Sequence, residues 1–385
     1  GLAACNVIRG RGAKDLAASR RRRTKTSQRV TVHDVAARAG VSTATVSRVV
    51  NDNPRVGPEV KARVTIAIEE LGYVPNQSAR SLTTHRTGSV GVVVLESADR
   101  LFGDPFFGQL MQGISAALAA RDRRLVLMLA PTREEGTRIE RYLVSDHVDG
   151  IVLVGPHGDD PLLANLRRGP VPIIVSGRPQ GGLSVSFVDA QNRAGAEAAV
   201  RHLLQSGRQT IATIHGTLDL PSATDRLEGY RDALRAAGRS PDPSLEAAGE
   251  YRARTAAEAT NRLLERHPDL DALFAASDSM AIAAMQAIKD SGRRVPEDVA
   301  VIGFDDLPTA RETRPTLSTV RQPIEAMGRE MVRLLLQQID QPGTAPDQVV
   351  FATELVLRGS TGDEDEPADT MAASAEPASV LTAGG

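Results

Sequence analysis

A twelve-residue segment, GVSTATVSRVVN from Gly40 to Asn51, combines small hydroxyl-bearing residues with a single long cation. Its only charged residue is Arg48, whose guanidinium can reach the O6 and N7 acceptors of guanine in a major groove. Hydroxyl groups and backbone amides at the start of a helix can bind phosphate oxygens. The residues that supply this set are Ser42, Thr43, Ala44, Thr45, Ser47 and Arg48. The pattern favours a helix that lies against DNA, although a plain surface helix with one solvated arginine would have the same pattern of residues.

Three short helices must position this segment, and their end signals stand in the sequence. Thr31 begins a capping box, and Gly40 has the position at which the first helix should end. Ser42 can cap the second helix. A Gly-Pro pair opens the third, because proline is favoured at the first helical position, and Gly72 ends it. Two helices joined by a tight turn, with a third completing the core, predict a helix-turn-helix headpiece.

Charge is distributed unevenly along the 385 residues, although the net charge is only −2. Residues 1–88 hold sixteen Lys/Arg and six Asp/Glu, and the rest of the chain holds 30 and 42. A basic head on an acidic body indicates that the head binds a polyanion. Residues 1–29, with four consecutive arginines, are expected to be a disordered basic arm, and residues 361–385, with six acids and no base, a disordered acidic tail.

Composition and missing motifs argue against several classes of protein. Apolar residues make up 41% of the chain, but no apolar run is long enough for a membrane span, and no secretory signal is visible. Cys5 is the only cysteine, which excludes an intrachain disulfide and a multi-cysteine zinc site and fits a cytoplasmic protein. Phosphate-binding glycine loops and nucleophile motifs such as GxSxG are absent. We therefore expect neither an enzyme nor a bound metal or cofactor.

From Ser89 onward, apolar strand-like runs alternate with helical stretches. This alternation predicts parallel sheets with helices on both faces, and roughly ten strands suit two α/β lobes better than one sheet. The expected strands lie in VGVVVLE, RLVLMLA, DGIVLVG, VPIIVSG, TIATIHG, ALFAASD and VAVIGFDD, and the expected helices lie near 106–121, 134–146, 225–237 and 279–291.

The segment Val30–Leu82 resembles the headpiece and hinge of the lactose-repressor (LacI/GalR) family through the motifs DVAxxAGVS, TVSRVVN and GYxPN. The resemblance continues through VPEDVAVIGFDD at 295–306 and PTLSTVRQP at 315–323. It implies an α/β protein with a helix-turn-helix headpiece at 30–75, a hinge helix and linker at 76–88, and a two-lobed, periplasmic-binding-protein-like (type I) core at 89–360. It also implies a homodimeric transcription regulator, expected to be a repressor, that binds a roughly palindromic operator.

The same resemblance assigns roles within the headpiece. The family reads bases with the two residues after the capping serine and with one arginine, which correspond here to Thr43, Ala44 and Arg48. Ala44 can offer only an apolar contact, for instance to a thymine methyl group. The implied phosphate contacts are Thr31, Ser42, Thr45, Ser47 and Asn51.

The segment PNQSARSL at 75–82 contains the start of the expected hinge helix. Asn76 can cap a helix of only two turns, which is too short to be stable in water by itself. Such a segment should fold only on DNA with its dimer mate. By resemblance, Leu82 is the leucine that wedges into the minor groove, and Ala79 is the small residue that lets two hinge helices touch. The alternative is a plain linker.

Two tandem lobes suggest a ligand cleft at the carboxyl ends of their strands. By resemblance, Asp305 accepts hydrogen bonds from effector hydroxyls, Arg226 grips the ligand, and Phe107 and Tyr251 form apolar or aromatic walls. Each has an alternative role: Phe107 as core, Arg226 in a surface ion pair, and Asp305 as a helix cap.

Two positions in this expected cleft depart from the family pattern. Ser176 stands where an aspartate is frequent, and Ser277 where an asparagine is frequent, so the effector cannot be copied from a relative. A sugar or sugar derivative suits an aspartate, an arginine and flat walls, while a purine or nucleoside would use a ring wall and an arginine as well. A free sugar-binding receptor would share the lobes, but it would not carry a basic helix-turn-helix head.

Overall fold

The structure is a computed structural model that describes residues 30–50, 53–74, 86–145, 147–158, 161–363 and, for the backbone alone, 377–382. The chain divides into two compact units, residues 1–80 and 81–385. The first unit contains the headpiece, whose helices are α1 (Val32–Ala39), α2 (Thr43–Val50) and α3 (Pro58–Leu71).

The headpiece helices begin and end where the sequence predicts. Thr31 and Asp34 form a reciprocal capping box at α1, and Gly40 ends that helix with a φ of 65°. Gly72 ends α3 with a φ of 61°, a left-handed conformation that glycine adopts without a steric penalty. One valine from each helix, Val35, Val46 and Val64, is fully buried at the centre. Burial of these side chains holds three helices that are individually too short to be stable.

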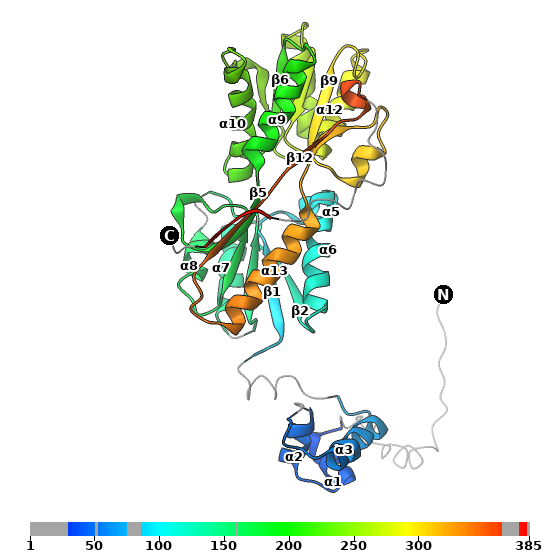
Figure 1. Cartoon of the computed structure of the whole chain (residues 1–385), viewed down its shortest axis with the longest axis vertical. Coiled ribbons are helices and arrows are strands. Elements are labelled where there is room, and N and C mark those ends of the chain that lie inside the picture. Colours follow the sequence, from blue (N-terminus) through cyan, green and yellow to red (C-terminus); the bar gives the residue numbers. More distant parts are fainter. Residues whose placement is uncertain are drawn as a thin grey trace, which may run out of the picture. The chain divides into compact units, whose positions relative to one another are not determined.

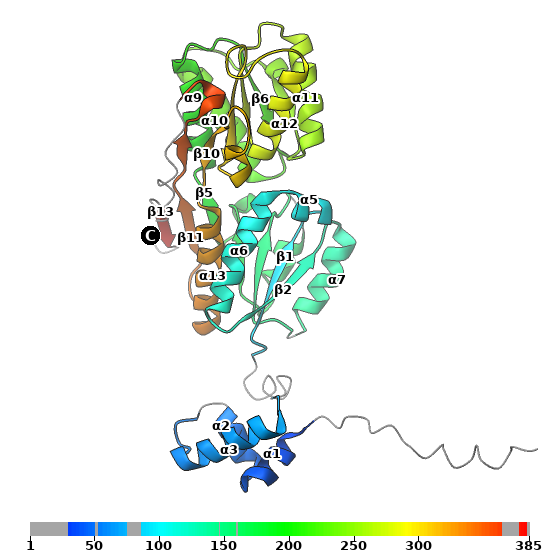
Figure 2. The ribbon, with the colours of Figure 1, turned by 90° about the vertical axis from the view of Figure 1, so that its right-hand side faces the viewer.

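The second unit consists of two α/β lobes, seen in Figures 1 and 2. The sheet of the first lobe has the strand order β13-β11-β5-β4-β3-β1-β2, and that of the second β12-β10-β9-β8-β6-β7. The strands are β1 (Ser89–Val94), β2 (Arg124–Leu129), β3 (Gly150–Val154), β4 (Ile173–Ser176), β5 (Ser186–Ala190), β6 (Ile211–His215), β7 (Glu246–Ala248), β8 (Ala272–Ala275), β9 (Ala300–Asp305), β10 (Ser318–Arg321), β11 (Asp347–Phe351), β12 (Glu354–Val356) and β13 (Pro377–Thr382).

Helices cover both sheets. In the first lobe α6 and α13 pack together on one face, and in the second lobe α9 packs against α10 and α11 against α12. None of the helices in the described part of the chain has both the length and the apolarity that crossing a bilayer requires. The helices are α5 (Ala98–Gly103), α6 (Pro105–Ala119), α7 (Arg133–Leu143), α8 (Pro161–Leu166), α9 (Asn192–Gln205), α10 (Pro221–Ala236), α11 (Ala253–Arg266), α12 (Asp278–Asp290) and α13 (Ile324–Asp340), with short 3-10 turns at Gln180–Gly182, Pro243–Leu245, Pro308–Arg311 and Gly359–Thr361.

Within each lobe the central strands run parallel, as β1 does with β2 and β3, and β8 does with β6 and β9. The chain passes between the lobes after β5, after β10 and after β11, and it returns to the first lobe between β12 and β13. Parallel strands place their carboxyl ends at one edge of each sheet, where ligands of open α/β sheets bind. The expected two-lobed α/β architecture is therefore confirmed.

The C-terminal expectation was wrong in one part. Residues 377–382, which fall in the predicted disordered tail, form strand β13, which pairs antiparallel with β11 from Asp347↔Thr382 to Phe351↔Pro377. The composition of the 25-residue tail hid the short segment PASVLT, which contains Val380 and Leu381. An edge strand such as β11 offers unpaired N–H and C=O groups to any segment that can extend beside it.

Candidate nucleic-acid interface and effector cleft

Helix α2 presents two different faces. Val46 is fully buried and Val49 nearly so, whereas Ser42, Ala44, Ser47 and Arg48 are exposed and Thr43 and Thr45 half-buried. The Arg48 side chain forms no ion pair with any other described residue. The anchored valines thus leave a small-residue surface with one long cation, the form that entry into a major groove requires.

Two predicted phosphate-binding hydroxyls already serve as helix caps. Ser42 Oγ accepts a hydrogen bond of 3.2 Å from the Thr45 amide and lies 2.9 Å from Thr45 Oγ1. Thr31 Oγ1 donates to Asp34 Oδ2 at 2.7 Å, and hydrogen bonds from the Thr31 amide and hydroxyl lower the pKa of Asp34. Any phosphate contact by these residues must therefore coexist with capping. Asn51, Asn76, Ala79 and Leu82 lie outside the described residues.

A cleft lies between the two lobes of the second unit, at the carboxyl ends of their strands. It contains five of the six predicted effector residues, Phe107, Ser176, Arg226, Tyr251 and Asp305. Charged and amide side chains also line the cleft, among them Glu96, Arg100, Asp104, Asp189, Asn192 and Gln322.

Arg226 and Asp305 form the polar floor of this cleft. Arg226 comes from α10 and is 5% exposed, and it donates from Nε to Asn192 Oδ1 at 2.9 Å and from Nη1 to the carbonyl of Ala276 at 2.6 Å. Its guanidinium carbon also lies 3.6 Å from the centre of the Phe304 ring. These partners fix a buried guanidinium in one orientation, because its planar fork matches several acceptors at once.

Asp305 ends strand β9 with an unusual φ of 119° and is 4% exposed. Its Oδ1 accepts from Gln322 Nε2 at 2.6 Å and lies 3.4 Å from Arg226 Nη1. Burial raises the pKa of Asp305 to about 7, against the opposing effect of Arg226. Burial also raises the pKa of Asp189, which accepts from Asn192 Nδ2 at 2.9 Å. The floor therefore contains two poorly solvated carboxyls that can accept hydrogen bonds from a ligand.

Aromatic rings form the walls. The Tyr251 ring packs against Gly216, where an added Cβ would lie 2.0 Å from a ring carbon. Phe107 is 3% exposed and meets Phe106 edge-on, at a centroid distance of 5.4 Å. Arg100 lies between the two walls, 4.8 Å from the Tyr251 centroid and 5.6 Å from that of Phe107.

Two polar atoms of this wall are buried without a hydrogen-bond partner among the described residues, Arg100 Nε and Tyr251 Oη. Leaving such a group unsatisfied costs about 1–3 kcal/mol, so buried polar atoms are normally paired. Both residues line the cleft. Their unused hydrogen-bonding capacity is what a polar ligand would satisfy.

The two serine positions differ in where the structure places them. Ser176 is half-buried at the end of β4 and lines the cleft. Ser277 does not: it is the N-cap of α12, its Oγ accepts from the Met280 amide at 3.3 Å, and it is 2% exposed. A serine before a helical aspartate is a capping signal, and this reading accounts for Ser277 without a ligand.

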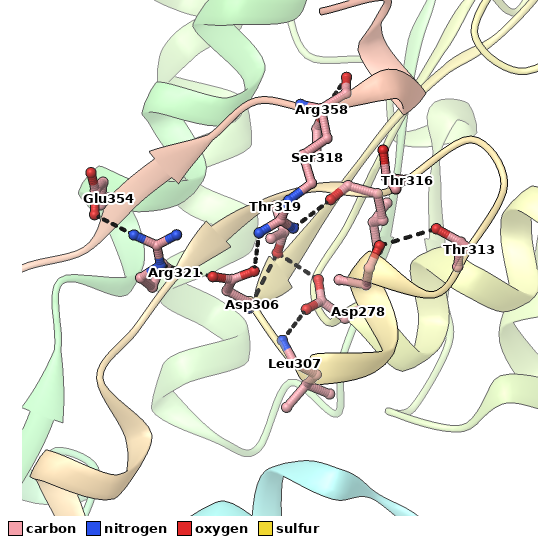
Figure 3. Close-up of polar contacts among 12 residues, drawn as sticks. Asp278, Asp306, Leu307, Thr313, Thr316, Ser318, Thr319, Arg321, Glu354 and Arg358 are labelled. Carbon is pink, nitrogen blue, oxygen red and sulfur yellow. Dashed lines mark hydrogen bonds and ion pairs between the residues drawn. The ribbon is translucent and has the colours of Figure 1, made fainter. Parts of the chain in front are cut away.

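A polar network joins the residues that follow β9 to α12 and β10 (Figure 3). Asp278 accepts from the Leu307 amide at 2.7 Å and from Thr319 Oγ1 at 2.5 Å. Asp306 accepts from Arg321 Nε at 2.7 Å and from the buried Arg358 at 2.6 Å. Burial raises the pKa of Asp278 well above its usual range. Because Arg321 ends β10, where the chain crosses to the first lobe, the network joins the strand that carries Asp305 to a crossover.

Several cleft residues were missed by the sequence reasoning. Asp104 had a usable signal, since an aspartate before proline is typical of a helix start, and it accepts from the Phe106 amide at 3.2 Å. Glu96 follows the apolar strand β1 by two residues, which places it beyond the carboxyl end of that strand. Arg100 and Gln322 carried no local signal, because only the folding of two lobes brings them to the cleft.

Comparison with known proteins assigns the chain to a family. Residues 31–76 match the family described as "Bacterial regulatory proteins, lacI family", and residues 200–361 match "Periplasmic binding protein-like domain". The HTH-type transcriptional regulator CelR of Thermobifida fusca is 44% identical over 335 residues, which cover 86% of this chain and 98% of that protein. The chain belongs to the lacI family.

Other members of the lacI family support the placement. The ribose operon repressor of Escherichia coli K12 is 33% identical, over 86% of this chain and 99% of its own. A solved CelR–cellobiose complex has 43% identity, a TM-score of 0.69, and coverage of 86% and 100%. The lac repressor dimer, solved with operator and the anti-inducer ONPF, has 28% identity, a TM-score of 0.78, and coverage of 86% and 99%. The chain is accordingly a DNA-binding transcription regulator with a ligand-binding core.

Proposed function

We propose that the protein is a homodimeric repressor whose affinity for a roughly palindromic operator is controlled by a carbohydrate bound between its lobes. It acts on DNA in the cytoplasm and catalyses no reaction. The headpiece match, the relatives named as repressors and the solved lac repressor dimer on its operator support the DNA-binding part. The cleft supports the effector part.

One observation carries the choice of a carbohydrate: polar groups converge on a cleft with ring walls. The floor carries Arg226 and Asp305, and the wall carries the unsatisfied Tyr251 Oη and Arg100 Nε. Hydroxyl groups donate to carboxylates and accept from guanidinium groups, while the apolar face of a sugar ring stacks on aromatic rings. The relative CelR has been solved with cellobiose, so cellobiose is the first compound to test.

In the DNA-bound state we propose that Thr43, Ala44 and Arg48 contact base edges. Thr31, Ser42, Thr45, Ser47 and Asn51 are proposed to contact phosphates, with Asn76, Ala79 and Leu82 acting in a hinge at the operator centre. The guanidinium of Arg48 supports this assignment, since it is exposed on an otherwise small-residue face and forms no ion pair with any residue that the structure describes. Proteins that replace counterions on DNA lose affinity as salt rises, so operator binding should fall steeply between 50 and 200 mM salt.

The test combines ligand binding with operator binding. Full-length protein is titrated with cellobiose, other sugars and nucleosides by calorimetry, and the operator selected from random DNA is followed by fluorescence anisotropy. We expect one saccharide to bind and to change operator affinity by about 5- to 150-fold, the usual range of allosteric coupling. A nucleoside that binds while every sugar fails would replace the carbohydrate assignment. A chain that selects no operator would overturn the regulator itself.

A further inference from the structure

Polar contacts join the two lobes at one side of the cleft. Asp219, in the loop between β6 and α10, accepts through its carbonyl from the Gly158 amide at 3.0 Å and from Gln180 Nε2 at 2.8 Å. Its carboxylate Oδ2 lies 3.0 Å from His157 Nδ1. Nearby, Arg178 of the first lobe and Asp225 of the second form an ion pair at 2.7 Å. These contacts exist only while the lobes are together.

His157 is unusual among these groups because both of its ring nitrogens face carboxylates. Nδ1 lies 3.0 Å from Asp219 Oδ2 in the second lobe, and Nε2 lies 3.2 Å from Glu96 Oε1 in the first. A neutral imidazole has one N–H and one lone pair, so it can donate to only one carboxylate and must oppose the other with a lone pair. The imidazolium donates to both. With both carboxyls ionised, the arrangement therefore fits only the protonated ring.

We propose that His157 is a proton-binding latch: when protonated it bridges Glu96 and Asp219 and holds the lobes closed, so that pH controls the same closure that the effector controls. The link to the effector rests on the proposed function. The latch itself rests on the three side chains, and we call them the His157 latch.

The charged groups around the ring come from three elements. Glu96 follows β1 and Asp219 precedes α10, and Arg100 of α5 is the cation that pairs with Glu96. Asp159 and Asp160 follow in sequence, outside the described residues. Two carboxylates against one guanidinium favour the imidazolium. The hydrogen bond to Glu96, followed by the charges of both carboxylates, raises the pKa of His157 against the effect of its partial burial.

The raised pKa of His157 determines how lobe closure depends on pH. When the lobes separate, His157 loses Asp219 but keeps Glu96, so its pKa falls only by the part that Asp219 contributes. Closure thus takes up a proton in the window between the open-state pKa and the higher closed-state pKa. The contribution to closure is complete below the open-state pKa and is lost as pH rises through the closed-state pKa.

The latch also contacts the effector cleft. Glu96 and Arg100 both line the cleft, and Arg100 lies 4.8 Å from the Tyr251 centroid in the opposite lobe. A proton on His157 and a ligand against Tyr251 therefore favour the same arrangement of lobes. Because coupling between two sites is reciprocal, protonation should tighten effector binding as much as the effector raises the affinity for the proton.

The test of the His157 latch measures lobe closure in the absence of sugar. Cys5→Ser full-length protein receives one label in each lobe, at the exposed positions Glu134 and Arg254 after substitution by cysteine, and the interlobe distance is followed by energy transfer. From pH 6 to pH 8.5 we expect the closed-to-open ratio to fall about two- to fivefold, the range of a partly exposed ion pair. His157→Gln and Asp219→Asn should each weaken this dependence, leaving only the part that Asp305 contributes.

The matched control is Asp225→Asn, which breaks the Arg178 ion pair between the same lobes. The control leaves Glu96, His157 and Asp219 unchanged, so it should lower closure at both pH values and keep the wild-type pH dependence. A His157→Gln protein with the wild-type profile, or a wild-type protein with a flat one, overturns the latch. If the distance responds to pH but no sugar binds, the latch stands and the carbohydrate assignment fails.

Discussion

Arg226 and Asp305 face each other in the floor of the cleft at 3.4 Å, a longer separation than either keeps from its other hydrogen-bond partners in the cleft. Arg226 binds the Ala276 carbonyl at 2.6 Å, and Asp305 accepts from Gln322 at the same distance. The long contact leaves room for a ligand hydroxyl to accept from the guanidinium and donate to the carboxylate. Both side chains are about 95% buried, so each already carries the cost of lost hydration before a ligand arrives.

Replacing Arg226 by alanine should remove effector binding while DNA binding persists. Truncating one partner of a buried, charged hydrogen-bond pair usually costs about 2–5 kcal/mol, so cellobiose affinity should fall at least about 30-fold. Calorimetry with cellobiose and anisotropy with operator measure the two effects. Arg235→Ala, on the same helix with a half-exposed side chain, is the control and should change neither. An Arg226→Ala protein that still responds to the sugar would place its site elsewhere.

The raised pKa of Asp305 gives the sugar-free protein a distinct pH dependence. Its folded pKa of about 7 lies above the ordinary aspartate value near 4, so between these values the folded protein retains a proton that the unfolded chain has released. Stability must therefore fall as pH rises through this window, by up to a few kcal/mol. Asp305→Asn lacks the titration, and the difference between its melting temperature and that of the wild type should rise from pH 5 to pH 8. Parallel curves would show that Asp305 is ionised throughout.

The headpiece was more predictable than the cleft for a physical reason. Its helices begin and end on local signals, such as the Thr31 capping box and the glycine at position 40, and local signals are visible in one sequence. Arg226 and Asp305 were found only through resemblance, although their place at strand ends agrees with the general rule for parallel sheets. The role of His157 could not be predicted from the sequence, because it depends on two carboxylates that lie about 60 residues away on either side in sequence.

Strands β10 and β12, which were not predicted, show the same limit of prediction from local sequence. β10 and β12 are only four and three residues long, and their hydrogen-bond partners lie in distant parts of the chain. A run of that length shows no period that separates a strand from a loop. β13 was missed because its partner, β11, decides whether an extended segment has an edge to join.

Gly216 offers a test of the aromatic wall that leaves Arg226 and Asp305 unchanged. A Cβ at this position would lie 2.0 Å from a Tyr251 ring carbon, so Gly216→Ala must displace the ring. We expect cellobiose affinity to fall at least about tenfold, since stacking area and the Tyr251 hydroxyl are both misplaced. The matched control is Gly108→Ala on α6, where no atom lies within 4 Å of an added Cβ; it should raise stability by about 0.5–1 kcal/mol and leave binding unchanged. Normal binding by Gly216→Ala would remove Tyr251 from the effector site.

Replacing Arg48 tests whether this residue recognises a specific base or only contributes to non-specific DNA binding. It is exposed on α2, whereas Arg38 on α1 forms an ion pair with Glu70 of α3 at 2.5 Å. If Arg48 reads a guanine, Arg48→Ala should lose about 1–3 kcal/mol of operator affinity, or roughly 5- to 150-fold, and keep most of its affinity for random DNA. Anisotropy with both DNAs at several salt concentrations measures this. Arg38→Ala should leave the ratio of the two affinities unchanged. Equal losses on operator and random DNA would instead make Arg48 a phosphate contact, with a salt dependence about one ion weaker than that of the wild type.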